Sequence, residues 1–209
     1  MHNTIDKPLT WRAKSHPSGR LQTTACCRRD GRVQALAKPV YARLMVQTIR
    51  ILGIDPGLGV TGWGVIDQTG TRLSLVAHGV IKTPVKSPLP QRLEAIFAAV
   101  EALVAEYAPG EAAVEDQFVS ANAGTALKLG QARAAAILPA ARAGLTVAEY
   151  APRLVKKSVV GTGAADKTQV AAMMSVILPG SRAVADAADA LAVAVCHAHH
   201  RGSIAKVSA

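Results

Sequence analysis

The sequence predicts a mixed α/β domain in which a five-stranded sheet is flanked by helices. Three strand-like segments with hairpin-length connections come first, within residues 48–82. Helical and strand-like segments then alternate over residues 89–150, and two more helical segments lie within residues 166–200. An antiparallel meander followed by alternating elements is typical of a sheet that combines antiparallel and parallel strands, with helices packed on its faces.

The three-strand meander is predicted from apolar runs and turn residues. Residues 49–55 are mostly apolar and stop at Pro56-Gly57, which ends a buried strand. Residues 60–67 and 72–82 form the next two strands, and the turn Gln68-Thr69-Gly70 joins them.

The alternating part is predicted from helical spacing and chain breakers. Apolar residues recur every three or four positions from Leu89 to Tyr107, and Pro109-Gly110 ends that helix. The same criteria give two strands and three more helices: strand 112–115, helix 122–143, strand 145–150, helix 166–178 and helix 186–200.

The chain divides into three parts by composition. Residues 1–46 are predicted to be a basic, disordered extension, residues 47–203 the folded domain, and residues 204–209 a short tail. Residues 1–44 hold nine Lys/Arg and two Asp/Glu, so they carry most of the net charge of +10. This basicity suggests a polyanionic partner but says little about the domain itself. The extension resembles transit peptides in composition, and Met45 is an alternative natural start.

The composition favours a cytoplasmic protein without a membrane segment. No run approaches the ~20 apolar residues that a spanning helix needs. The three cysteines, Cys26, Cys27 and Cys196, are odd in number and match no zinc-binding spacing. A reducing compartment is therefore expected.

Four carboxylates stand at positions that suggest a metal site. Asp55 ends the first predicted strand and Glu115 the fourth. Asp186 and Asp189 are three residues apart at the start of an otherwise apolar helix, so they share one face. Buried carboxylates are costly unless they are paired, and oxygen ligands suit Mg²⁺ or Mn²⁺. Each acid also has a simpler interpretation as a turn or helix-capping residue, and spacing alone does not show that the four converge.

Several motifs together resemble the RuvC family of crossover junction endodeoxyribonucleases, which have an RNase H-like fold. The resemblance spans residues 50–201. The matching stretches are Arg50-Ile51-Leu52-Gly53-Ile54-Asp55-Pro56-Gly57 with Thr61-Gly62-Trp63-Gly64, Val114-Glu115-Asp116-Gln117-Phe118, residues 122–133, residues 155–167 and residues 186–192. Their order and spacing match as well, which makes the resemblance specific.

The resemblance implies an enzyme that resolves four-way (Holliday) DNA junctions. Asp55, Glu115, Asp186 and Asp189 would be catalytic and would bind two Mg²⁺, with Mn²⁺ as an alternative. The reaction would be hydrolysis that leaves a 5′-phosphate and a 3′-hydroxyl. The family also implies a homodimer that nicks two opposed strands symmetrically, and the RuvA–RuvB branch-migration complex as a partner.

Further site residues are expected from the same resemblance. Lys167 would be catalytic through its charge at the phosphate, and Phe118 would stack on a base at the junction. Four basic residues would hold DNA phosphates: Lys128, Arg133, Lys156 and Lys157. Asp116, beside Glu115, departs from the neutral Gln of some relatives, and it could add charge to the site or point away.

The sequence disfavours several other functions. Residues 161–168 nearly match a P-loop, but Asp166 stands where the second glycine is required, which disfavours an ATPase. The cluster Cys196-His197-Ala198-His199-His200 closes a helix and is interpreted as structural rather than zinc-binding. A junction-binding module without catalysis would be expected to lack some of the four acids. An RNase H-like nuclease with another substrate remains the nearest alternative.

Overall fold

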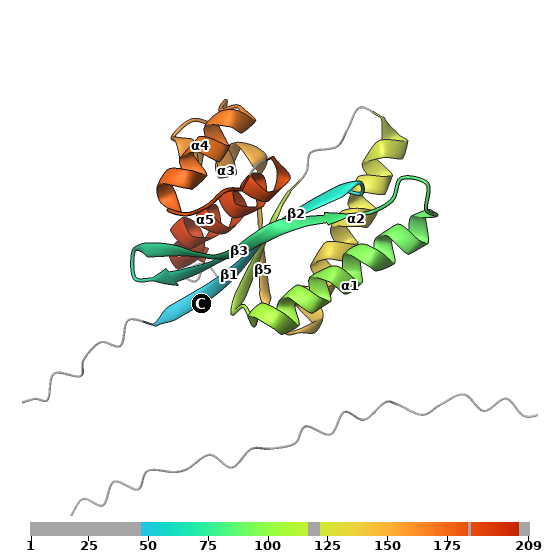
Figure 1. The fold of residues 1–209 in the computed structure, drawn as a ribbon, viewed down its shortest axis with the longest axis horizontal. Coiled ribbons are helices and arrows are strands. Elements are labelled where there is room, and N and C mark those ends of the chain that lie inside the picture. Colours follow the sequence, from blue (N-terminus) through green and yellow to red (C-terminus); the bar gives the residue numbers. More distant parts are fainter. Residues whose placement is uncertain (1–46, 117–121, 184, 205–209) are drawn as a thin grey trace, which may run out of the picture. The chain divides into compact units, whose positions relative to one another are not determined.

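The computed structural model describes residues 47–116, 122–183 and 185–204. Figure 1 shows the elements that these residues form. The strands are β1 (Thr48–Asp55), β2 (Val60–Thr69), β3 (Arg72–Lys82), β4 (Glu111–Glu115) and β5 (Thr146–Tyr150). The helices are α1 (Leu89–Tyr107), α2 (Ala123–Arg142), α3 (Pro152–Val160), α4 (Lys167–Ile177) and α5 (Asp186–Ile204).

The five strands form one mixed sheet in the order β3-β2-β1-β4-β5. The β1–β2 and β2–β3 pairs are antiparallel, whereas β1–β4 and β4–β5 are parallel. Ile54 pairs with Val114, and Glu115 pairs with Tyr150. The carboxyl ends of β1, β4 and β5 therefore meet at one edge of the sheet, the usual place for a functional site in such sheets.

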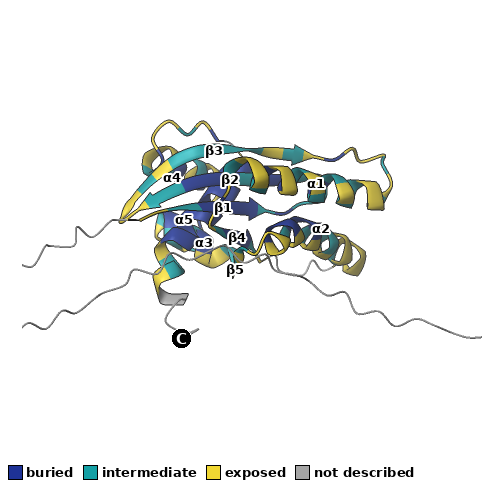
Figure 2. Ribbon diagram, turned by 90° about the horizontal axis from the view of Figure 1, so that it is seen from below, coloured by how far each residue is buried: buried dark blue, intermediate teal, exposed yellow. Residues whose placement is uncertain are grey.

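Helices cover both faces of the sheet (Figures 1 and 2). Leu52 and Ile54 of β1 face α1 and α2, where they pack into a core that includes Ile96 and Val100. Ile51 of the same strand faces the opposite way, into a core with the side chains of α3, α4 and α5. This alternation follows from the two-residue period of a strand. Both faces of β1 are therefore buried.

Glycines let α5 approach the sheet closely. A Cβ atom at Gly53 would lie 2.3 Å from the Ala190 carbonyl oxygen, and one at Gly64 would lie 2.5 Å from the Leu191 side chain. Such distances are far below van der Waals contact, so β1 and β2 have space for the helix only because these positions lack side chains. The amino-terminal end of α5 is thereby held against the strands.

The predicted mixed sheet of antiparallel and parallel strands is confirmed, but α3 was not predicted. The helix has only 9 residues, and it contains Lys156 and Lys157, which were predicted only as phosphate contacts. Its signals are nevertheless present in the sequence: Pro152 in the first turn, Val155 and Val159 buried four residues apart, and Gly161 at the carboxyl end with φ 83°.

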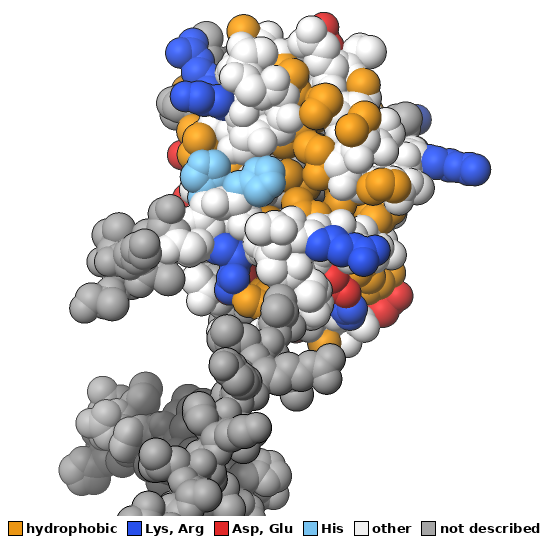
Figure 3. Space-filling view, turned by 90° about the vertical axis from the view of Figure 1, so that its left-hand side faces the viewer, with side chains coloured by type: hydrophobic (Ala, Val, Ile, Leu, Met, Phe, Trp, Pro, Cys, Tyr) orange, Lys and Arg blue, Asp and Glu red, His pale blue; other side chains and the backbone are white. Residues whose placement is uncertain are grey.

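The predicted extension at residues 1–46 and most of the tail at 204–209 lie outside the described residues. Among the described residues, no helix is long and apolar enough to cross a membrane. Figure 3 shows that Lys and Arg side chains on the viewed face stand in separate groups, with hydrophobic side chains between them. This pattern agrees with the small net charge of the domain compared with the extension.

Candidate metal centre

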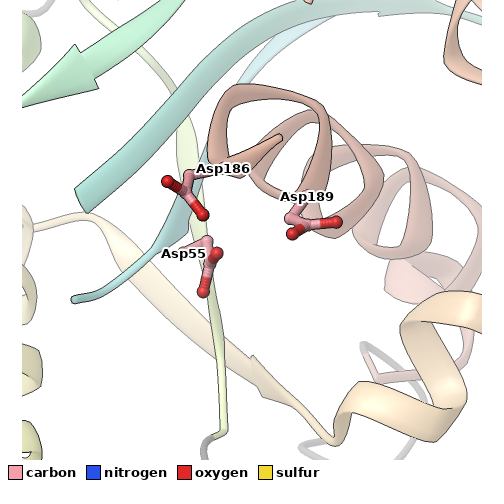
Figure 4. Close-up of side chains that lie close together, drawn as sticks. All are labelled: Asp55, Asp186 and Asp189. Carbon is pink, nitrogen blue, oxygen red and sulfur yellow. The ribbon is translucent and has the colours of Figure 1, made fainter. Parts of the chain in front are cut away.

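Three of the predicted carboxylates converge at the edge where the parallel strands end. Asp55 comes from the end of β1, and Asp186 and Asp189 come from the first turn of α5 (Figure 4). One carboxylate oxygen of each lies within 4.8 Å of the others. All three side chains are partly buried. The structure thus brings together residues that are more than 130 positions apart in the chain.

The start of α5 is shaped by an unusual backbone conformation. Ala185 has φ 48°, in the left-handed region that residues with a side chain rarely adopt. Its carbonyl accepts hydrogen bonds from the N–H groups of Ala188 (2.9 Å) and Asp189 (3.1 Å), which begin the helix. Asp186 and Asp189 then lie in the first turn of the helix, a common place for acidic side chains because it is the positive end of the helix dipole.

Glu115 completes the acidic group from the neighbouring strand. The pKa of its carboxyl is raised to about 8, chiefly by burial, with further contributions from the negative charges of Asp55 and Asp189 and from a hydrogen bond with Asp55. Lys156 opposes this shift. Because the charges of Asp55 and Asp189 raise the pKa of Glu115, its carboxyl belongs to the same site. A bound cation would offset the repulsion between these carboxylates.

Lys167 lies beside the two aspartates of α5. Its Nζ atom is 3.0 Å from Asp189 Oδ2 and 3.5 Å from Asp186 Oδ1. A hydrogen bond to Asp189 and the charges of both aspartates raise the pKa of this ammonium group. Asp166 caps α4 and Lys167 follows in its first turn, where the helix dipole disfavours a cation. The two carboxylates compensate for that unfavourable placement.

These groups line a cleft of about 530 Å³. All four acids, Lys156 and Lys167 contribute to its wall. The cleft also contains residues that the sequence analysis did not select, among them Leu129 and Pro152. Pro152 could have been found, because it lies only two residues after the end of β5 and so at the same end of the parallel strands as Asp55 and Glu115. An open acidic cleft with two flanking lysines suits hydrolysis of a phosphodiester with bound metal ions.

The other predicted DNA contacts lie in different surroundings. Lys128 and Lys157 are exposed and are not part of the cleft wall. Arg133 makes a close ion pair with Glu149, and its Nη2 atom is 3.6 Å from Asp116 Oδ1. Asp116 therefore faces Arg133 and not the cleft. Phe118 lies outside the described residues.

The histidines of α5 differ in burial: His197 is buried, His200 is half-buried and His199 is exposed. His197 is 2% exposed and contacts Tyr150 and Glu111, while the His200 Nδ1 atom is 2.8 Å from the Cys196 carbonyl oxygen. The rings of His197 and His200 thus make hydrogen bonds within the protein, as polar groups removed from water generally do.

Comparison with known proteins identifies the same fold and family. A family model described as "Crossover junction endodeoxyribonuclease RuvC" matches residues 51–197. A curated relative of that name from Maricaulis maris is 64% identical over 157 residues, which cover 75% of this chain and 95% of the relative.

Two solved structures extend the comparison. The Thermus thermophilus RuvC in complex with a Holliday junction substrate has a TM-score of 0.69 and 35% identity, and the match covers 73% of this chain and 94% of that one. The yeast mitochondrial Holliday junction resolvase has a TM-score of 0.56 and 14% identity, over 79% of this chain and 87% of its own. The second similarity supports the fold alone.

Proposed function

The chain belongs to the RuvC family of crossover junction endodeoxyribonucleases, and we propose how its residues carry out the reaction. It is a metal-dependent nuclease that resolves Holliday junctions in DNA recombination and repair. The convergence of Asp55, Asp186 and Asp189 in the wall of the cleft is the observation that supports the mechanism best.

The donor set fits Mg²⁺. All the candidate ligands are carboxylate oxygens, which Mg²⁺ and Mn²⁺ prefer. Their oxygen atoms lie within 4.8 Å of one another. Two oxygens bound to the same Mg²⁺ at about 2.1 Å can be at most about 4.2 Å apart, which is close to this distance. Together with Glu115, the site offers enough oxygens for the two ions that phosphodiester hydrolysis commonly uses. We propose Mg²⁺, with Mn²⁺ as an alternative.

Each side chain then has a defined task. When bound, the ions would supply a nucleophilic water and offset negative charge at the scissile phosphate. Hydrolysis would then leave a 5′-phosphate and a 3′-hydroxyl. Asp55, Glu115, Asp186 and Asp189 hold the ions in the cleft. The Lys167 ammonium, already directed to this edge by its aspartate contacts, stabilises negative charge on the phosphate in the transition state.

DNA binding is assigned to the residues around the cleft. Lys156 in the cleft wall and the exposed Lys128 and Lys157 bind backbone phosphates, which makes binding sensitive to salt. Phe118 follows β4 closely in the sequence and stacks on a junction base. Arg133 remains a predicted phosphate contact, although carboxylates engage it here.

The substrate suggests the assembly. A four-way junction has two equivalent strands to cut, so a homodimer presents one site to each and nicks them symmetrically. We propose cooperation with the RuvA–RuvB branch-migration complex and action in the cytoplasm on chromosomal DNA. Residues 47–203 form the nuclease domain, residues 1–46 a basic extension and residues 204–209 a tail.

Cleavage of a synthetic mobile junction in Mg²⁺ tests the proposal, with linear duplex as the control substrate. We expect paired symmetric nicks in the junction from the wild type, and no nicks from Asp55→Asn, which should still bind the junction. Junction binding without cleavage in both Mg²⁺ and Mn²⁺ would contradict the mechanism. Cleavage of the duplex instead would contradict the substrate.

A further inference from the structure

A chain of polar contacts lies behind the metal centre, between the sheet and α5. The Tyr150 hydroxyl is 2.8 Å from His197 Nδ1, and His197 Nε2 is 2.7 Å from Glu111 Oε2. Arg201 donates from Nε to Glu111 Oε2 at 2.9 Å and from Nη2 to Glu111 Oε1. We call these four residues the polar clamp. The mechanism above uses none of them.

The charge states of the clamp follow from its surroundings. The Arg201 guanidinium lowers the pKa of Glu111, so this carboxylate only accepts hydrogen bonds. Burial lowers the pKa of His197, so its ring is neutral. Nε2–H therefore donates to Glu111, and the bare Nδ1 accepts from the Tyr150 hydroxyl. Every contact thus has a donor and an acceptor, and the clamp has one defined arrangement.

The clamp joins the elements that carry the acids. Glu111 begins β4, the strand that ends at Glu115, and His197 and Arg201 belong to the helix that begins at Asp186. Tyr150 pairs with Glu115 across β4 and β5, and its carbonyl accepts a hydrogen bond of 2.8 Å from Asp116 N–H. A shift of α5 along β4 would break the clamp and separate Asp189 from Glu115.

The rest of the α5–sheet contact offers little to prevent such a shift. Between Asp189 and His197 the helix has only Ala, Leu, Val and Cys residues, all buried. Ala190 and Ala194 lie against Gly53, which presents no side chain. Apolar contact is not directional, whereas hydrogen bonds depend strongly on distance and angle. Gln68 adds one more directional bond at the clamp end, from its Nε2 to the Ala198 carbonyl at 3.1 Å.

We propose that the polar clamp sets the position of α5 on the sheet and thereby the spacing of Asp186 and Asp189 from Asp55 and Glu115. Its members are positioning residues: they touch neither the substrate nor the metal, and they tune the affinity of the site for divalent cations. This inference rests on the proposed function, in which the four acids hold those cations.

Two measurements on the full-length protein test the proposal. Calorimetric titration with Mn²⁺ gives the dissociation constant of the metal, and thermal unfolding in EDTA gives the stability of each variant. Tyr150→Phe removes one hydroxyl and keeps the ring, so folding should be retained, and His197→Leu removes both ring contacts. We expect the Mn²⁺ dissociation constant to rise about tenfold, the lower end of the effect of residues that orient metal ligands. Val193→Ala is the matched control, because Val193 is fully buried in the same helix and lies outside the clamp.

The outcomes separate the clamp from general stability and from the metal site. Weaker Mn²⁺ binding in Tyr150→Phe, but not in a Val193→Ala variant of equal or lower melting temperature, supports the clamp. Unchanged affinity in Tyr150→Phe and His197→Leu, or losses that simply follow melting temperature across all three variants, would overturn it. Equal Mn²⁺ binding by the wild type and Asp189→Asn would instead overturn the metal site itself.

Discussion

Gly62 of β2 lies directly against the backbone of Asp186. A Cβ atom at Gly62 would be 1.9 Å from the Asp186 carbonyl oxygen and 2.5 Å from its carbonyl carbon. Both atoms belong to the backbone, so no side-chain rotation can relieve the overlap. The absence of a side chain in one strand therefore helps to decide where a metal ligand of α5 stands.

Gly62→Ala should therefore displace the start of α5 and weaken the metal site. We expect cleavage of the junction in limiting Mg²⁺ to fall at least about tenfold, because positioning errors of about 1 Å have effects of this order or larger. A higher Mg²⁺ concentration should restore part of the activity. Gly59→Ala is the control, since a Cβ atom there has no neighbour within 4 Å. Equal loss in both variants would show that the Asp186 contact is irrelevant.

Glu115→Gln should change how stability depends on pH in the absence of metal. The pKa of Glu115 rises from 4.5 to about 8 on folding, so the folded protein holds a proton that the unfolded chain releases above pH 4.5. The contribution of Glu115 to the free energy of unfolding of the wild type should be largest below pH 4.5 and should decline as the pH rises to about 8. The variant has no such group, so its free energy of unfolding relative to that of the wild type should rise over that window, by on the order of 5 kcal/mol.

Urea unfolding of both proteins in EDTA at several pH values measures this difference. The comparison needs no DNA and no activity. A constant difference between pH 4.5 and pH 8 would mean that Glu115 is ionised in the folded protein throughout.

Lys167→Met should separate catalysis from stability. The side chain of Lys167 is 67% exposed, and exposed ion pairs contribute only about 0–1 kcal/mol. Removing one group that stabilises transition-state charge, however, commonly lowers the rate about 100-fold or more. We expect a melting temperature close to that of the wild type, nearly unchanged junction affinity, and a large loss in the single-turnover cleavage rate. Retained cleavage would exclude a catalytic role for this lysine.

Lys128→Ala and Arg133→Met should differ in their effect on salt-dependent binding. Each phosphate contact that is lost reduces the slope of log affinity against log salt concentration by about 0.9. The exposed Lys128 should show this reduction. Arg133 has to leave Glu149 and Asp116 to bind a phosphate, so its loss should reduce the slope less than the loss of Lys128 does. An unchanged slope for Arg133→Met would exclude Arg133 as a phosphate contact.

Local sequence patterns predict most of the helices and strands and the chemical groups that they carry. The apolar run that stops at Asp55-Pro56-Gly57 predicts β1 and places an acid at its end, and the spacing of Asp186 and Asp189 predicts a shared helix face. These inferences succeed because strand and helix periods act over a few residues. The short helix α3 was missed, since a 9-residue segment presents too few periodic positions.

Which of these groups meet depends on how the elements pack together. The approach of Asp55 to Asp186 and Asp189 depends on the parallel pairing of β1 with β4 and on glycines that let α5 lie close to the sheet. The pairing of Arg133 with Glu149, and the contact of Tyr150 with His197, likewise join separate elements. Separation along the chain carries no information about such contacts, because the packing of the whole core brings the elements together.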